Sequence, residues 1–134
     1  MTRRILCLFA LASSACRTKP EFPPGLFPET IAGVWRRTSV ADLAVSGAPD
    51  PVPRNSVDRL KTAVYEGPGH VEARVYQLES AAVGLDLAQR WRPSADTVFF
   101  NRGIYFVVVR WQTADRKALQ ALIAELQREL APPS

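Results

Sequence analysis

The stretch GIYFVVVRW at residues 103–111 constrains the fold more than any other part of the sequence. Ile104 to Val109 is an unbroken apolar run, and a short run of this kind is typical of a strand that is covered on both faces. The segment TVFF at 97–100 precedes it, with a turn at 101–103 between them. We therefore predict an antiparallel hairpin that contributes a central strand to a sheet.

A second hairpin is predicted upstream. The segments 62–66 (TAVYE) and 70–78 (HVEARVYQL) flank a Gly-Pro-Gly turn. The second of them alternates apolar and charged residues, which is typical of a half-buried antiparallel strand. Ahead of this hairpin we expect a capped helical turn at Ser56–Leu60 and a strand at Val34–Thr38.

Helical periodicity appears twice. Ser80 is a natural N-cap for the segment 81–91 (AAVGLDLAQRW), and Thr113 is a natural N-cap for the last helix. The last helix has the clearer amphipathic stripe, formed by Leu119, Leu122, Ile123, Leu126 and Leu130. The order hairpin–helix–hairpin–helix predicts an α+β fold, an antiparallel sheet of four to five strands with both helices on one face.

The N-terminus has the layout of an export signal. Arg3 and Arg4 form a basic start, the apolar segment 5–12 is too short to span a bilayer, and Ser13-Ser14-Ala15 supplies small residues. We expect residues 1–15 to be a signal peptide. The alternative, a buried helix, is disfavoured because the stretch has no amphipathic face and leads into a proline-rich segment.

Two kinds of cleavage remain open. Ordinary signal peptidase could cut after Ala15, which would leave a secreted or periplasmic soluble protein. The piece Ser13-Ser14-Ala15-Cys16 also resembles a bacterial lipobox, although Ser13 replaces the usual aliphatic residue. Loss of Cys7 with the leader would leave Cys16 as the unpaired cysteine of an exported chain. We therefore expect Cys16 to be lipidated and to hold the protein at the membrane of the cell envelope.

The remaining organisation follows from composition. The segment 16–28 is rich in proline and is predicted to be a tether, 29–131 a single domain and 132–134 a tail. A loop is expected at 46–55 for the same reason. The leader contains two of the 17 basic residues and none of the 13 acidic ones, so removing it lowers the net charge from +4 to +2. This charge argues against a nucleic-acid partner.

No catalytic or metal-binding constellation is apparent. His70, the one histidine, is expected to be a surface turn residue, and no cofactor or metal site is predicted. A hydrolase that uses carboxylates remains an alternative. Its candidates are Glu66, Glu72, Glu79 and Asp86, none of which has an unusual apolar context.

Each tryptophan adjoins arginine, and aromatic faces beside guanidinium groups suit sugar rings, anionic lipid headgroups or a partner protein. An envelope protein or a glycan is therefore an expected kind of partner. The alternative is that each ring packs at the edge of the core while its arginine lies in solvent. The possible ligand or partner surface comprises Trp35, Arg36, Arg37, Arg90, Trp91, Arg92, Arg110 and Trp111.

Four stretches together resemble an uncharacterised family of bacterial exported domains over about residues 27–130. They are FPETIAGVWRR, AVYEGPGHVEARVYQLES, AAVGLDLAQRW and GIYFVVVRW. The family is known only as a domain of unknown function, often behind a signal peptide or lipobox, so the resemblance implies export and no catalytic residues. We expect a non-enzymatic envelope lipoprotein that acts as a binding or accessory module. The alternatives are an exported hydrolase and a secreted, unlipidated binding module.

Overall fold

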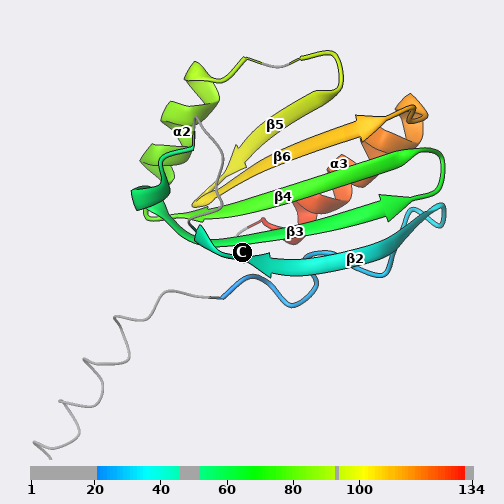
Figure 1. The fold of residues 1–134 in the computed structure, drawn as a ribbon, viewed down its shortest axis with the longest axis horizontal. Coiled ribbons are helices and arrows are strands. Elements are labelled where there is room, and N and C mark those ends of the chain that lie inside the picture. Colours follow the sequence, from blue (N-terminus) through cyan, green and yellow to red (C-terminus); the bar gives the residue numbers. More distant parts are fainter. Residues whose placement is uncertain (1–20, 46–51, 93, 132–134) are drawn as a thin grey trace, which may run out of the picture.

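The computed structural model describes residues 21–45, 52–92 and 94–131. This part of the chain forms one antiparallel sheet with two α-helices and a short 3-10 helix (Figure 1). In chain order the elements are β1 (Thr30–Ile31), β2 (Trp35–Leu43), η2 (Arg54–Ser56), β3 (Val57–Glu66), β4 (His70–Leu78), α2 (Ala81–Arg90), β5 (Thr97–Arg102), β6 (Tyr105–Gln112) and α3 (Arg116–Glu129).

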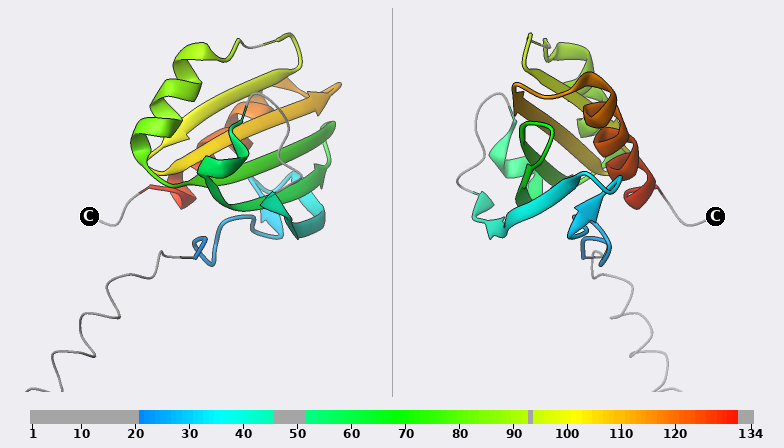
Figure 2. Two further views of the ribbon diagram at one scale, coloured as in Figure 1. Left: turned by 60° about the vertical axis from the view of Figure 1, so that its left-hand side comes forward. Right: turned by 90° about the vertical axis from the view of Figure 1, so that its right-hand side faces the viewer.

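The sheet has six strands in the order β1-β2-β3-β4-β6-β5, and every neighbouring pair is antiparallel. It curls into a half-barrel (Figure 1 and Figure 2). The prediction of four to five strands is wrong. The two hairpins lie where their turns predicted them, but β1 and β2 add a longer extension to the sheet than the sequence indicated.

The helices lie on opposite faces of the sheet, so the prediction that both cover one face is also wrong. Phe106 and Val108 of β6 pack in a cluster with Leu87 of α2. Their neighbours Val107 and Val109 pack in a cluster with the leucines of α3. Because side chains of a strand alternate between faces, an unbroken apolar run needs a cover on each side, and one helix supplies each.

Two local predictions, the helical turn at 56–60 and the cap of the last helix, are also wrong. The expected helical turn at Ser56–Leu60 is mostly strand, because β3 begins at Val57 and buries both Val57 and Leu60. The last helix is capped by Asp115 rather than Thr113. The Asp115 carboxylate accepts a hydrogen bond from the backbone N–H of Ala118 at 2.9 Å, which satisfies a donor that the first helical turn leaves unpaired.

The segment ahead of β1 belongs to the domain. Leu26 and Phe27, which lie inside the predicted tether, are 2% and 5% exposed. Two hydrogen bonds hold this segment to the sheet: the Tyr65 hydroxyl donates to the Pro28 carbonyl at 2.6 Å, and Nη1 of Arg37 donates to the Phe27 carbonyl. The packed domain therefore begins near residue 22, before the predicted boundary at residue 29.

Several predictions lie outside the described residues. These are the signal peptide 1–15, Cys16 and the first part of the tether, residues 46–51 of the predicted loop, and the tail 132–134.

Candidate functional site

Trp35 is a core residue and offers no binding surface. It opens β2 and is 1% exposed. Its indole Nε1 donates a hydrogen bond to the Ala118 carbonyl of α3 at 2.8 Å. The ring thus ties the sheet to α3, while Arg36 beside it is exposed and Arg37 holds the N-terminal segment.

Trp91 packs on the face of the sheet that α2 covers. Its ring centroid lies 5.8 Å from that of Phe99 and 5.4 Å from that of Phe106. Arg90 next to it forms an ion pair with Asp86 at 2.8 Å, and Arg92 is exposed. This tryptophan therefore closes the core beneath α2.

Trp111 lies near the end of β6 and packs against the cluster beneath α3. The structure thus does not bring the three tryptophans together on one surface, because Trp35 is buried and the other two pack on opposite faces. Trp111 differs from them because its half-buried ring borders two grooves in the surface. Of the predicted surface, these grooves contain Arg110 and Trp111.

The larger groove has a volume of about 400 Å³ and lies between β5 and α3. One wall comes from the face that α3 turns toward β5, where residues recur at helical spacing. The lining mixes apolar side chains with polar ones, and its charged member is Arg116. The lining residues are Ser94, Ala95, Val98, Trp111, Ala114, Arg116, Leu119, Gln120 and Ile123.

The smaller groove has a volume of about 200 Å³. It is lined by His70, Glu72, Arg110, Trp111 and Gln112. Glu72 lies opposite Arg110 in the register of β4 and β6, and it forms an ion pair with Arg74 at 3.5 Å. His70 starts β4, and its Nδ1 lies 2.5 Å from a carboxylate oxygen of Glu66 across the hairpin turn. This histidine is half-exposed, and the Glu66 carboxylate contacts one nitrogen of its ring.

The four candidate carboxylates do not form a catalytic pair in these grooves, where only Glu72 is found. Glu66 contacts His70, Asp86 pairs with Arg90, and Glu79 accepts a hydrogen bond from the Ser56 hydroxyl at 3.4 Å. Across the described ranges there is no group of three or more His, Cys, Asp or Glu residues arranged to hold a metal ion.

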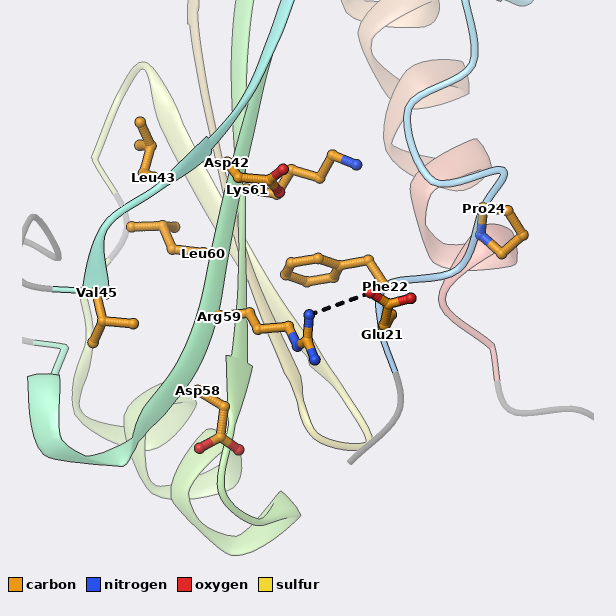
Figure 3. Close-up of a pocket in the computed structure, with 10 residues that line it drawn as sticks. All are labelled: Glu21, Phe22, Pro24, Asp42, Leu43, Val45, Asp58, Arg59, Leu60 and Lys61. Carbon is orange, nitrogen blue, oxygen red and sulfur yellow. Dashed lines mark ion pairs between the residues drawn. The ribbon is translucent and has the colours of Figure 1, made fainter. Parts of the chain in front are cut away.

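A third groove, of about 470 Å³, lies at the opposite end of the sheet, where β2 ends and β3 begins (Figure 3). Phe22 and Lys61 lie on one side of the strands in this view, and Leu60 and Val45 lie on the other. Arg59 forms an ion pair with Glu21 at 3.7 Å. The remaining lining residues are Pro24, Asp42, Leu43 and Asp58.

Burial raises the pKa of three tyrosines without creating a reactive group. It raises that of Tyr65 to about 12, against the opposing effect of the Arg37 charge. It also raises the pKa of Tyr76, partly offset by a hydrogen bond from Arg74, and that of Tyr105. None of the three lines a groove described above, so they serve as neutral parts of the core.

Comparison of the chain with protein-family models, with curated proteins and with solved structures finds no match. Neither helix of the described ranges has the length and apolar character needed to cross a bilayer.

Proposed function

We propose that the protein is an exported envelope lipoprotein, anchored through Cys16, whose domain binds a partner protein and carries out no catalysis. The sequence supports the export and anchoring part. A basic start, a short apolar stretch and small residues precede Cys16. Lipidation gives this otherwise unpaired exported cysteine a role, since two acyl chains provide stable attachment where one is marginal.

The binding part rests on one observation, the groove between β5 and α3 that is bordered by Trp111. Aromatic side chains in partly apolar hollows are typical anchors of protein interfaces. Because Arg116 is the charged residue in the lining, the groove complements a partner segment that carries an apolar side chain next to an acidic one.

The position of β5 indicates how such a segment would bind. β5 is the last strand of the sheet, and no other strand of the described part pairs with its outer edge. An extended peptide can add to a free edge through main-chain hydrogen bonds, while pockets beside the edge select its side chains. The partner we propose is therefore an extended polypeptide segment bound along β5, with its apolar side chain against Trp111 and Ile123.

The experiment places a photo-crosslinking amino acid at Ile123 in the full chain, expressed in cells. A matched variant carries it at Leu85, which is 54% exposed on α2 over the other face. We expect a discrete, protease-sensitive adduct from Ile123 alone. The adduct should be lost in Arg116→Glu, which reverses the charge in the groove, and kept in Arg92→Glu. Glutamate in the first helical turn is favourable, so R116E should leave α3 folded.

The outcomes separate the candidate partners. An adduct that resists protease and is removed by glycosidases would replace the protein partner with a glycan. Equal crosslinking from Ile123 and Leu85, or an Ile123 adduct that is unaffected by R116E, would contradict binding in this groove.

A further inference from the structure

The described chain begins beside the third groove, and this position bears on how an anchored domain would lie. Phe22 packs against Tyr105 with ring centroids 6.0 Å apart. Leu26 and Phe27, a few residues further along, are buried. The chain from residue 22 onward is thus held on the domain and provides no slack for a tether.

The proposed link between anchor and domain is consequently short. Residues 17–21 separate Cys16 from Phe22. At about 3.5 Å per residue, full extension gives roughly 20 Å. The point where the chain joins the domain therefore stays within about 20 Å of the lipid surface.

The distance between the two ends of the sheet is greater than the roughly 20 Å that residues 17–21 can span between Cys16 and Phe22. Arg59, near the start of β3, pairs with Glu21 at the anchored end, and Glu66 at the end of β3 meets His70 at the other. Because a strand rises about 3.3 Å per residue, the seven steps from Arg59 to Glu66 separate these ends by about 23 Å. Figure 1 shows the described chain starting near the end of β2 and far from the β3–β4 turn.

The anchored end also has the chemistry of a surface that can contact phospholipid headgroups. Leu43, which lines this groove, is 37% exposed. Arg59 and Lys61 supply positive charge for phosphates, and Glu21 and Asp42 supply negative charge for headgroup amines (Figure 3). Such a mixed surface complements a bilayer in which both headgroup charges are present.

We infer that this anchor-proximal end, formed by Glu21, Phe22, Leu43, Arg59 and Lys61, rests on the bilayer and that the domain stands upright from it. The inference depends on the proposed lipidation of Cys16. It places the Trp111 groove toward the far end of the sheet, away from the lipid, where a partner in the aqueous compartment can reach it.

The test uses the lipidated full-length mature chain in vesicles of phosphatidylethanolamine and phosphatidylglycerol. A fluorophore is attached at Lys61→Cys in one sample and at Gln112→Cys, which is exposed at the end of β6, in the other. Lipids with a nickel-chelating headgroup quench fluorophores close to the surface. We expect the label at position 61 to lose most of its fluorescence and the label at position 112 to keep it.

Intact-mass measurement on the same samples distinguishes the two ways of failing. A mature chain without lipid mass would overturn the proposed anchoring and the orientation with it. Full lipid mass with equal quenching at both positions would overturn the orientation alone, since the domain would then lie flat or tumble. If Lys61→Cys fails to fold, Asp42→Cys, exposed in the same groove, takes its place.

Discussion

Replacing Gly69 with alanine should destabilise the fold strongly, because the backbone of its turn packs closely against the backbone just before α3. Gly69 has φ of +155°. A Cβ atom there would lie 2.4 Å from the Thr113 carbonyl oxygen and 2.6 Å from Cα of Ala114. These are backbone atoms that cannot rotate away. A hydrogen bond also holds the turn against the start of α3: the backbone N–H of Asp115 donates to the Pro68 carbonyl at 3.0 Å.

The expected loss has two parts. Placing a side chain in this glycine-only backbone region costs about 1–3 kcal/mol. Forcing apart packed backbone adds about 1–3 kcal/mol. We therefore expect Gly69→Ala to lower the free energy of unfolding by roughly 4 kcal/mol, a large share of the 5–15 kcal/mol typical of a domain.

Gly33→Ala is the matched control. Gly33 also has positive φ, +71°, but a Cβ there meets nothing within 4 Å, so only the conformational cost of about 1–2 kcal/mol applies. Urea unfolding of the mature chain, followed by its tryptophan fluorescence, measures both. Equal losses for the two variants would refute the steric argument and with it the close packing of the β3–β4 turn against α3.

The remaining predictions concern a cap and a buried hydroxyl. Asp115→Ala should lower the free energy of unfolding by about 1 kcal/mol, whereas Ser80→Ala should change it little, because Ser80 makes no side-chain cap bond; thermal melts of both variants compare them. Tyr65→Phe should cost about 1 kcal/mol at pH 7, since the Pro28 carbonyl loses its donor. The folded state raises the pKa of Tyr65 from 10.0 to about 12, so its contribution is complete below pH 10 and is lost as the pH rises toward 12. Urea titrations across this range should show a shallower decline for Tyr65→Phe than for wild type, and identical slopes would contradict the assignment.

The parts of the fold that the sequence predicted have strong local signals. Glycine and proline mark the turn at 67–69, and the apolar stripe from Leu119 to Leu130 marks α3. The run Ile104–Val109 indicated a strand covered on both faces, which is what the structure has. A strand covered on both faces needs a packing element on each side of the sheet. This expectation disagrees with the expectation that both helices cover one face, and the structure has one helix on each face.

Other features carry no such signal. β2 continues to Leu43 although its residues from Thr38 onward are all exposed. Without an apolar alternation, only its register with β3 identifies it as a strand. The N-terminal segment looked like a tether because of its prolines, yet Leu26 and Phe27 find their partners only in the folded domain.

The candidate groove was partly visible in the sequence. The adjacency of arginine and tryptophan in the sequence points to Arg110 and Trp111, and the apolar stripe of the last helix contains Leu119 and Ile123. Their meeting with Val98 depends on the placement of β5 at the sheet edge, which local periodicity does not specify. Adjacency of tryptophan and arginine was a weak guide, because it also selected Trp35, whose ring is a core contact.

The most direct test of the proposed lipoprotein is the intact mass of the mature chain from the membrane fraction, compared with a Cys16→Ala variant. The account predicts a wild-type chain that begins at Cys16 and carries the mass of a diacylglyceryl group, and a variant that lacks this mass. A wild-type chain that begins at Cys16 without lipid, or one that keeps residues 1–15, would contradict it.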